Sequence, residues 1–446
     1  MGINEMRKRV REQLKEEPGI MSFAYPYVGL WQGIDEEVIK EAWKSSPTPK
    51  GALYLHIPFC RSRCGYCNYA TNFVGGLNAE EKHEIFKPYV DAVEKEIALL
   101  KPVVKTEFDS VYIGGGTPTI LCEKGLERIV RLATTSWPIS PTAEVSIEVY
   151  PQKRMLRNKL ALLKKLGVNR LSVGVQDFDD AVIAFTGRKY TGQDAYEIVQ
   201  EAKSLFDTVN IDLICGLPKQ NITLWRKTLK TALSLAPQQI TVQPFADRHP
   251  DIRFNHPKYL HLKPSKHQKR EMYDLACQML KERGYRQTSR HQFVLSEENR
   301  YEQEITESAP RLGIGAHSIS FVPSGLTYKN ITSLDEYKRQ IADGKLPVES
   351  GYVLNDDDKM RSYLFYALSA DCGQLSLNEK LFAQKFNTKI QDAFPNEAKA
   401  LEQEGLIEVR PDRINLTPTG IYFTSLIQRI FYNPELMKRK EEIYSK

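Results

Sequence analysis

The sequence is short of the features that mark an exported, membrane-bound or disulfide-stabilised protein. Its 446 residues include only 7 Cys, an odd number and too few for a disulfide scaffold of this size. No apolar run approaches the ~20 residues that a membrane-spanning helix needs. The N-terminus, MGINEMRKRVREQLKEEPG, is charged and has no apolar signal-peptide core. We therefore expect a reduced, cytoplasmic protein without a membrane span.

A strong excess of one charge is also missing. The 62 Lys and Arg outnumber the 56 Asp and Glu by six, and no long basic run occurs. Nucleic acid is therefore not a required partner. The hydrophobic share of 41% and the charged share of 26% are ordinary for a soluble globular protein, and the length allows two or three domains.

Three of the few cysteines lie within eight residues of one another, in the context LYLHIPFCRSRCGYCNYATN. The alternating run 53–57 predicts a strand, which Pro58 ends because proline cannot donate to a sheet ladder. Arg61 and Arg63 lie between the thiols and are expected to favour their thiolate form. The cluster consists of Cys60, Cys64 and Cys67, whereas Cys122, Cys215, Cys277 and Cys372 are scattered and read as small buried hydrophobic residues.

Three neighbouring thiolates suit a soft metal. They are ligands for zinc, copper(I) or an iron–sulfur cluster. A structural zinc ion would take four ligands, whereas three cysteines on a four-iron cluster leave one iron open for a substrate or cofactor. Zinc binding and simple burial of the thiols remain the alternatives.

From residue 51 to about 290, strand-like and helix-like runs alternate. The strand-like runs are 53–57, 110–114, 145–149, 170–175, 209–214 and 239–244. The amphipathic runs between them are 87–100, 125–133, 154–167, 194–206 and 224–236. This alternation predicts a parallel sheet with right-handed crossovers, whose site lies at the carboxyl ends of the strands.

Glycine and polar residues follow several of these strands. The run Gly114–Thr119, GGGTPT, lets the backbone approach a ligand closely, although a glycine turn needs no ligand. Glu148 at a strand end can accept bonds from ribose hydroxyls, or it is simply solvated. Arg188 can clamp a carboxylate or form a surface ion pair, and Asp212 within an apolar strand is either paired or faces the site. Gln176 offers both a donor and an acceptor.

The motifs C-x3-C-x2-C after HIPF, GGTPT, SIE-x-x-P and IDLI-x-GLP occur here in one order. In these motifs the sequence resembles the radical SAM superfamily, and within it the family of oxygen-independent coproporphyrinogen III dehydrogenase, including its related C-methyltransferases. The resemblance implies an α/β fold with a partial (β/α)6 parallel barrel. It also implies a [4Fe–4S] cluster on Cys60, Cys64 and Cys67, with one S-adenosylmethionine, or two in the methyltransferase branch. The implied cofactor-binding residues are Tyr54, Gly115, Gly116, Thr117, Glu148, Gln176, Arg188 and Asp212.

Departures from the family's motifs guide the expected reaction. The decarboxylating members carry a fourth cysteine where this sequence has Tyr69, and the haem-chaperone motif HN-x-x-YW has only a poor counterpart near Arg290–Phe293. We therefore expect reductive cleavage of S-adenosylmethionine to a 5′-deoxyadenosyl radical, used for methyl or methylene transfer to an sp2 carbon of an unsaturated small molecule. The alternatives are oxidative decarboxylation of coproporphyrinogen III in porphyrin biosynthesis, and haem binding and delivery. Expected partners are this substrate and a low-potential electron donor such as flavodoxin or ferredoxin, and the chain is expected to be a monomer.

Three regions are expected along the chain. Residues 1–50 form an N-terminal segment, whose aromatic run SFAYPYVGLWQG either lines a substrate entrance or packs on the barrel. Residues 51–332 form the radical SAM core and its extension, which ends with the glycine-rich turn Arg311–Ser318; His317 within it is a proton carrier or a satisfied core residue. Residues 333–446 predict an α-rich, winged-helix-like domain with a two-stranded hairpin at 407–417.

Overall fold

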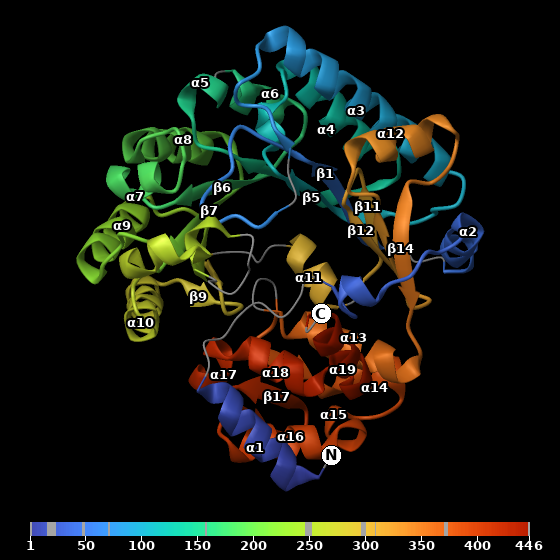
Figure 1. Cartoon of the computed structure of the whole chain (residues 1–446), viewed down its shortest axis with the longest axis vertical. Coiled ribbons are helices and arrows are strands. Elements are labelled where there is room, and N and C mark those ends of the chain that lie inside the picture. Colours follow the sequence, from blue (N-terminus) through green and yellow to red (C-terminus); the bar gives the residue numbers. More distant parts are fainter. Residues whose placement is uncertain are drawn as a thin grey trace.

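A curved sheet of twelve strands forms the centre of the molecule, in the order β14-β13-β12-β11-β1-β4-β5-β6-β7-β8-β10-β9 (Figure 1). The computed structural model describes residues 2–15, 24–46, 50–69, 72–156, 158–245, 252–295, 300–307, 309–369 and 373–444. Six neighbouring strands in the middle of the sheet run parallel and match the six predicted runs. They are β1 (Gly51–Ile57), β4 (Phe108–Gly115), β5 (Ile139–Val149), β6 (Arg170–Gln176), β7 (Thr208–Cys215) and β8 (Gln239–Pro244).

Helices cover the outer, convex face of this sheet (Figure 1). They are α3 (Ala79–Leu100), α4 (Glu123–Thr135), α5 (Lys153–Leu156), α6 (Lys159–Lys165), α7 (Asp180–Phe185), α8 (Gly192–Leu205), α9 (Ile222–Leu235) and α10 (Lys266–Glu282). Helix α3 begins with a capping box between Asn78 and Glu81, which satisfies backbone donors at its first turn. The predicted run 154–167 is divided into α5 and α6, because Asn158 adopts φ 65°, a left-handed conformation that asparagine tolerates.

Both ends of the sheet are extended by further strands. Strand β11 (Arg311–Ile314) is parallel to β1, and β12 (Ile319–Val322), β13 (Leu326–Asn330) and β14 (Val348–Val353) continue antiparallel, with α12 (Leu334–Ala342) between the last two. At the other end, β10 (Gln292–Val294) and β9 (Arg286–Gln287) are added. Within the described residues β9 and β14 do not pair, so the sheet is an open barrel. The predicted partial barrel is confirmed.

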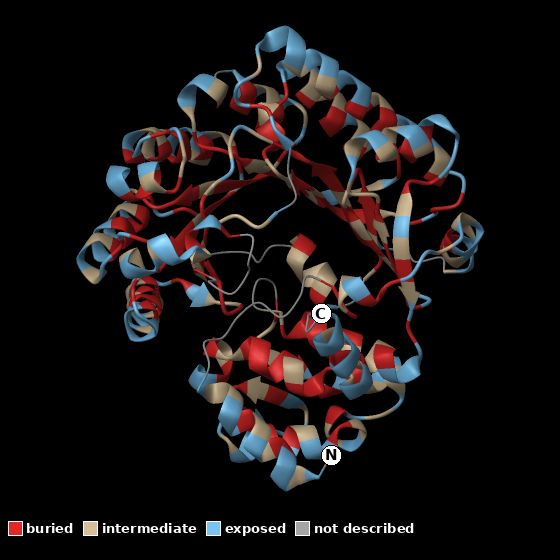
Figure 2. Ribbon diagram, viewed as in Figure 1, coloured by how far each residue is buried: buried red, intermediate tan, exposed pale blue. Residues whose placement is uncertain are grey.

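Each of five neighbouring strands has a partly exposed residue with buried residues on both sides of it. These residues are Tyr54, Tyr112, Glu148, Gly174 and Asp212. Tyr54 is in register with Tyr112, and Gly174 with Asp212. Because side chains alternate across a strand, these residues share the inner face of the sheet, while the apolar residues beside them belong to the hydrophobic core under the helices. Figure 2 shows that the strands of the large sheet are mostly buried. The sequence thus builds a barrel with a polar and aromatic interior.

A short helix, α11 (Arg300–Thr306), lies within the curve of the sheet (Figure 1). The ring of its Tyr301 stacks on Tyr112 with centroids 4.8 Å apart, and Tyr112 stacks in turn on Tyr54 at 6.1 Å. Ser110 of β4 donates a hydrogen bond to Glu304 of the same helix. Helix α11 therefore fills part of the barrel interior and leaves three aromatic rings side by side there.

The C-terminal region is mainly helical, as predicted. It contains α13 (Asp356–Ala367), α14 (Glu379–Phe386), α15 (Ile390–Ala393), α16 (Pro395–Gln403), α17 (Pro418–Tyr422), α18 (Thr424–Phe431) and α19 (Pro434–Tyr444). Its small sheet joins β16 (Ile407–Val409) and β17 (Arg413–Leu416), the predicted hairpin, to β15 (Ser376–Asn378). The wing therefore has three strands and not the two predicted, because the short run at 376–378 carries no period-2 pattern that sequence reading could detect.

The N-terminal segment packs mainly against this C-terminal region. Helix α1 (Ile3–Leu14) buries Met6 and Val10 in the C-terminal core, and Arg7 and Arg11 each pair with Glu404 at 2.8 Å. Helix α2 (Glu36–Ser45) instead lies against the large sheet, where the Trp43 indole donates to the Tyr328 hydroxyl at 3.0 Å.

The aromatic run SFAYPYVGLWQG is described from residue 24 onward. The Tyr25 hydroxyl donates to Asp358 at 2.9 Å, and the Tyr25 ring lies 4.8 Å from that of Tyr432. Further along, Gln32 exchanges backbone hydrogen bonds with Gly351 of β14. The described part of the run thus ties the C-terminal region to the edge of the large sheet.

Candidate functional site

The three clustered cysteines lie on the loop that follows β1. Strand β2 (Phe59–Cys60) pairs with β3 (Asn72–Phe73), so that the Val74 N–H donates to the Cys60 carbonyl at 2.9 Å. Cys67 N–H donates to the Cys64 carbonyl at 3.2 Å, which curls the loop. All three thiols are partly buried. Each of Cys64 and Cys67 lies close enough to raise the pKa of the Cys60 thiol through the repulsion of like charges.

Burial dominates the ionisation of these thiols in the absence of a metal. It raises the pKa of Cys60 to about 11 and also raises that of Cys67. The positive charge of Arg188 lowers the pKa of Cys60 and of Cys67, and that of Arg63 lowers the pKa of Cys67. Arg61 donates to the Gln152 side chain at 2.6 Å instead. Positive charge that favours the thiolate thus comes from Arg188 and Arg63.

The three thiols are soft donors of the kind that hold an iron–sulfur cluster, and the positive charge of Arg188 favours the thiolate form of Cys60 and Cys67. Among the residues that the structure describes, no group of three His, Cys, Asp or Glu side chains is arranged to hold a single metal ion. Deprotonating buried thiols is costly unless a cation is present, so metal binding and thiolate formation are coupled here.

The glycine run after β4 lies directly against the cysteine loop. The Gly116 N–H donates to the Ile57 carbonyl at 2.8 Å, and a Cβ at Gly116 would lie 2.5 Å from the Phe59 carbonyl oxygen. The same Cβ would lie 3.0 Å from the Cys60 sulfur. Thr117 Oγ1 is 3.5 Å from that sulfur. Gly116 is therefore required for the loop and strand to approach each other, and Thr117 contacts a predicted cluster ligand.

Glu148 faces this run from the next strand. Its carboxylate accepts from the Gly115 N–H and from the Tyr112 hydroxyl, each at 3.1 Å. Gly115 has φ +113°, which glycine adopts without strain. Burial and the nearby Asp212 raise the pKa of Glu148 to about 8, against the lowering effect of its hydrogen bonds. The carboxyl group thus lies at the inner face of the sheet beside two predicted cofactor residues.

Tyr54 and His56 lie together on β1. The Tyr54 hydroxyl is 2.9 Å from His56 Nδ1, and the His56 ring lies 5.9 Å from that of His317 in the glycine-rich turn. Burial lowers the pKa of His56 to about 3, so its imidazole is neutral. The sequence reading missed His56, although the alternation of the strand places it on the same face as Tyr54.

Arg188 and Gln176 meet at the end of β6. Arg188 donates to the Tyr66 hydroxyl at 2.8 Å and to the Gly174 carbonyl, and its guanidinium lies 5.0 Å from the centre of the Tyr150 ring. Because Tyr66 lies between Cys64 and Cys67, Arg188 ties the cysteine loop to the sheet. Gln176 has φ 65°, an uncommon conformation for a residue other than glycine, at a bulge opposite β7.

Asp212 is paired with neighbouring side chains. It accepts from the Asn210 amide at 2.8 Å and from the Ser172 hydroxyl at 3.0 Å. The fully buried Arg170 completes this group by donating to Gln239 and Ser146. Asp212 is therefore paired, and it also lies on the inner face of the sheet, where its charge acts on Glu148. Neither Arg170 nor Tyr66 carried a sequence signal that marked it out.

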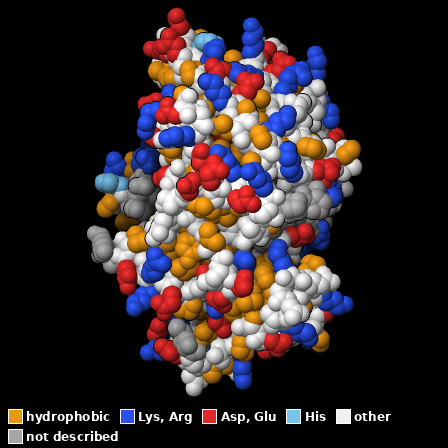
Figure 3. Space-filling view, turned by 90° about the vertical axis from the view of Figure 1, so that its right-hand side faces the viewer, with side chains coloured by type: hydrophobic (Ala, Val, Ile, Leu, Met, Phe, Trp, Pro, Cys, Tyr) orange, Lys and Arg blue, Asp and Glu red, His pale blue; other side chains and the backbone are white. Residues whose placement is uncertain are grey.

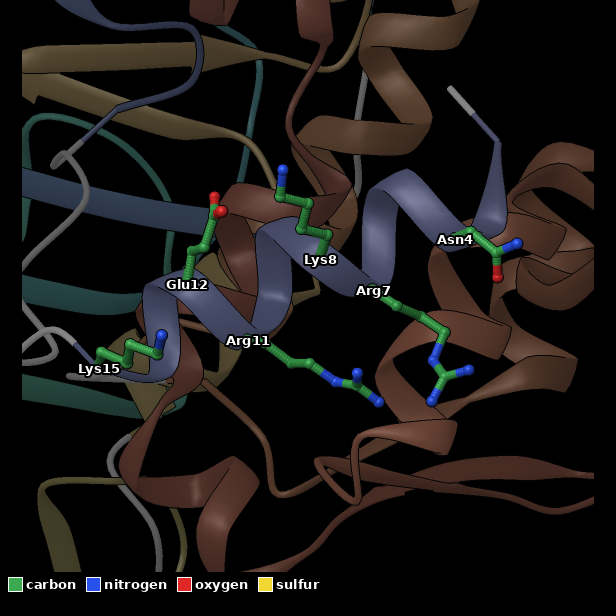
Figure 4. A pocket seen from close by; sticks show the side chains of 6 residues that line it. All are labelled: Asn4, Arg7, Lys8, Arg11, Glu12 and Lys15. Atoms are coloured by element: carbon green, nitrogen blue, oxygen red, sulfur yellow. The ribbon is translucent and has the colours of Figure 1, made fainter.

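A surface depression of about 470 Å³ is found far from these residues, beside α1 (Figure 4). Its lining residues belong to α1 and the residue that follows it: Asn4, Arg7, Lys8, Arg11, Glu12 and Lys15. Arg7 and Arg11 extend toward the C-terminal region, where they pair with Glu404. This depression is therefore lined by polar and charged side chains, and it contains none of the predicted site residues.

Comparison with known proteins agrees with this geometry. The family model described as "Radical SAM superfamily" matches residues 54–232, and "HemN C-terminal domain" matches residues 374–423. The chain is 28% identical to the "Heme chaperone HemW" of Bacillus subtilis, over 83% of this chain and 96% of that protein. It is also 28% identical to the "Oxygen-independent coproporphyrinogen III oxidase" of Synechocystis, over 89% of this chain and 87% of that protein. The solved coproporphyrinogen III oxidase of Escherichia coli superimposes with a TM-score of 0.80 at 25% identity, covering 95% of this chain and 98% of the other.

The sheet, the cysteine loop and these matches define a radical SAM enzyme. Within that superfamily, the chain belongs to the family of oxygen-independent coproporphyrinogen III oxidase and its relatives. Membership implies a [4Fe–4S] cluster and S-adenosylmethionine. Among the described residues, the structure contains no helix that is both long enough and apolar enough to span a membrane.

Proposed function

We propose that this enzyme directs a radical derived from S-adenosylmethionine at a tetrapyrrole. The single observation that supports this most strongly is the likeness to a coproporphyrinogen III oxidase across 95% of the chain, including the C-terminal region. The curated relatives at similar identity are named either as coproporphyrinogen III oxidases or as haem chaperones, and both names refer to tetrapyrroles. The aromatic rings of Tyr54, Tyr112 and Tyr301 inside the barrel suit a planar or partly conjugated substrate.

The protein's own groups would bind and orient the cofactors. Cys60, Cys64 and Cys67 would hold the cluster, which supplies a low-potential electron for cleaving S-adenosylmethionine into a carbon radical. The close approach of Gly115 and Gly116 to the cysteine loop leaves backbone groups without side-chain cover. Glu148 offers carboxyl oxygens that can accept hydrogen bonds from hydroxyl or ammonium groups, and Arg188 keeps the loop against the sheet. The buried surroundings exclude water from this chemistry.

Two reactions on such a substrate are open. One is oxidative decarboxylation, as the names of the coproporphyrinogen oxidases indicate. The second is carbon transfer from a second S-adenosylmethionine, which the sequence predicts because Tyr69 stands where decarboxylating members have a fourth cysteine. This methyl or methylene transfer has no counterpart among the relatives compared above, and it stays a prediction that rests on Tyr69. Haem binding and delivery is the non-catalytic alternative, named for the Bacillus relative.

The first experiment tests cofactor cleavage. Anaerobic reconstitution should load about four irons per chain, and dithionite should then drive formation of 5′-deoxyadenosine. Cys64→Ala should lose iron and this product, whereas Cys122→Ala, a change at an exposed cysteine outside the loop, should keep both. Full iron loading with no 5′-deoxyadenosine in the unaltered enzyme would contradict the proposed chemistry.

The second experiment separates the reactions. Methyl-labelled S-adenosylmethionine is incubated with coproporphyrinogen III or with haem, and the label, carbon dioxide and bound haem are measured. Carbon dioxide release without label in the product identifies decarboxylation, and labelled tetrapyrrole identifies carbon transfer. Stoichiometric haem uptake without turnover identifies a carrier. If 5′-deoxyadenosine forms but neither tetrapyrrole reacts or binds, the proposed substrate class is wrong.

A further inference from the structure

The stretch from residue 213 to residue 270 carries most of the positive charge of the chain. It contains eleven Lys or Arg residues and only two acidic residues, Asp247 and Asp251. Its surplus of nine positive charges exceeds the surplus of six in the whole chain, so the remaining residues together are slightly acidic. A charge excess confined to one stretch of chain marks a candidate interaction surface.

Two short 3-10 helices, η3 (Arg253–Asn255) and η4 (Pro257–Leu262), form a loop within this stretch. The loop is anchored from below, because Phe254 is fully buried and its ring stacks on that of Phe185 with the centroids 5.3 Å apart. The Lys219 N–H donates to the Leu262 carbonyl at 2.9 Å and holds the end of η4. The loop therefore has a defined position on the surface.

Cations of the loop lie over the rings of its aromatic anchor. The Lys219 ammonium is 4.5 Å from the centre of the Phe185 ring, and the Lys258 ammonium is 5.0 Å from that of Tyr259. The Arg253 guanidinium lies 5.9 Å from the centre of the same Tyr259 ring. Three positive charges are thus held over one aromatic cluster by cation–π contacts.

These cations are exposed and have no acidic partner. Within the part of the chain that the structure describes, no ion pair involves Lys219, Arg253, Lys258 or Lys266. Further along α10, Asp274 is already paired with Arg270 at 2.8 Å. A large apolar side chain, Leu260, is 53% exposed between them on η4. We call the exposed side chains Lys219, Arg253, Lys258, Leu260 and Lys266 the basic face.

Helix α9 extends the positive charge beyond the basic face. Its Leu224 packs on the same apolar cluster as Tyr259, and its exposed Arg226, Lys227 and Lys230 are likewise outside any ion pair among the described residues. Helices α9 and α10 lie on the side of the molecule opposite to the face in Figure 3 (Figure 1). On the face in Figure 3, basic and acidic side chains are interspersed. The excess of positive charge is therefore confined to one side.

We propose that the basic face docks this enzyme on a membrane surface that contains anionic phospholipids, with the Leu260 side chain inserted between the headgroups and the acyl chains. Lysine and arginine are attracted to the negative potential of such a surface, and an exposed apolar side chain adds burial. Docking of this kind needs no membrane-spanning helix, and none occurs among the described residues. The inference is independent of the proposed function, because the basic face includes no proposed cofactor ligand.

Two other polyanionic partners fit the basic face less well. Single-stranded nucleic acid stacks its bases on exposed aromatic rings, whereas here Phe254 is buried and cations lie over Phe185 and Tyr259. Protein interfaces are depleted in lysine, whereas lysine provides three of the four cations of the basic face. An exposed leucine surrounded by lysines agrees best with a segment that lies on a lipid surface.

The test measures how the whole chain, with its cluster reconstituted anaerobically, partitions onto sedimented vesicles. One set of vesicles contains phosphatidylglycerol in phosphatidylcholine, and the other contains phosphatidylcholine alone. Lys258→Glu with Lys266→Glu reverses two charges of the basic face, and Leu260→Ser removes its apolar side chain. Lys8→Glu with Lys345→Glu is the matched control, because both lysines are exposed and lie outside the basic face.

The unaltered chain should bind the vesicles with phosphatidylglycerol and not those without it, and binding should weaken as salt rises. The charge reversal should weaken partition at least about tenfold, and Leu260→Ser about threefold. The control should bind like the unaltered chain. The proposal is overturned if the unaltered chain does not bind anionic vesicles, binds both sets equally, or binds no better than the charge-reversal variant.

The choice of a membrane over other polyanions has its own measurement. A single-stranded RNA and polyglutamate, each at a charge concentration equal to that of the lipid, are added to the chain bound on vesicles. The chain should stay on the vesicles, because neither competitor buries Leu260. Its release by either one, or vesicle binding that Leu260→Ser leaves unchanged, overturns the choice of a lipid surface.

Two further measurements keep the outcome decisive. If the double charge reversal is poorly folded, Lys266→Glu alone should weaken vesicle binding about threefold with an unaltered unfolding transition, since a carboxylate is favoured in the first turn of α10. Formation of 5′-deoxyadenosine with dithionite should be equal in all variants. Its absence from every chain, the unaltered one included, would contradict the proposed function and leave the vesicle result as it stands.

Discussion

At the scale of single residues, the site depends on two kinds of placement. Cys60, Cys64 and Cys67 are held by the turns of one loop, and their chemistry follows from their spacing. Glu148 and Arg188 instead find their partners in other parts of the chain. Glu148 accepts from Gly115 and Tyr112 of β4, and Arg188 donates to Tyr66 of the cysteine loop. The placement of the cysteines can be predicted from the sequence, because it depends only on their spacing within one loop. The second kind depends on which strands become neighbours.

Gly116 provides a residue-scale test of the contact between the glycine run and the cysteine loop. Gly116→Ala should lower iron loading at least about tenfold, because the new Cβ would press on the Phe59 carbonyl and the Cys60 sulfur. Iron content and visible absorption after anaerobic reconstitution report the effect. Gly125→Ala is the matched control, since its Cβ would lie no closer than 3.6 Å to any atom and it lies in helix α4. Equal iron loading in both variants would show that the loop can move aside.

At the scale of elements, strands and helices of the core follow their sequence patterns closely. The six predicted strand runs correspond to β1 and β4 to β8, because buried parallel strands are continuous apolar runs bounded by turns. Short elements were harder to predict. Strand β15 has three residues and α11 has seven, and both depend on contacts with distant parts of the chain. Helix α11 in particular is held in the barrel by Tyr112 and Ser110.

Helix α1 provides an element-scale test, because its apolar face packs on the C-terminal core. Met6→Ala should reduce the free energy of unfolding by about 2 kcal/mol, since Met6 is only 6% exposed and its removal leaves a cavity. Lys8→Ala, on the exposed face of the same helix, should change it by less than about 0.5 kcal/mol. Urea unfolding measures the free energy of unfolding of both variants. A Met6→Ala variant as stable as Lys8→Ala would mean that α1 contributes little to the C-terminal core.

At the scale of the whole molecule, buried ionisable groups link stability to pH. Burial raises the pKa of Glu96 to about 7 and the pKa values of Glu148 and Glu304 to about 8. In the unfolded chain these carboxyls titrate near their ordinary value of about 4.3, so between pH 5 and 8 the folded state holds protons that the unfolded state has released. Folding therefore becomes less favourable as pH rises through the folded-state pKa values. His56 and His317, whose pKa values are lowered, act in the opposite sense only below about pH 6.5.

We accordingly expect the cofactor-free protein to lose stability between pH 7 and 8, by up to about 1.4 kcal/mol per pH unit for each such carboxyl. Glu96→Gln should make the pH dependence of unfolding shallower between pH 6 and 8. Glu336→Gln, at a partly exposed carboxyl whose pKa is lowered, should leave the slope in that window unchanged. Urea midpoints measured across this range test the prediction. A stability that rises from pH 7 to 8 in the unaltered chain would contradict it.

The amino-acid sequence by itself determined the order of the core elements, the fold class and the three clustered thiols, because each depends on spacing within a short stretch of chain. It also placed Glu148 and Gln176 at strand ends, and Gly115, Gly116 and Thr117 where β4 ends, which is the edge at which a parallel sheet forms its sites. The resemblance added Tyr54, Arg188 and Asp212. Only the tertiary structure decided that Asp212 is paired with Asn210 and Ser172, that Arg188 holds the cysteine loop through Tyr66, and that Gln152 holds Arg61. The physical reason is that the partner of a side chain depends on which strands and loops become neighbours in space. The sequence around that residue does not specify which distant segments these will be.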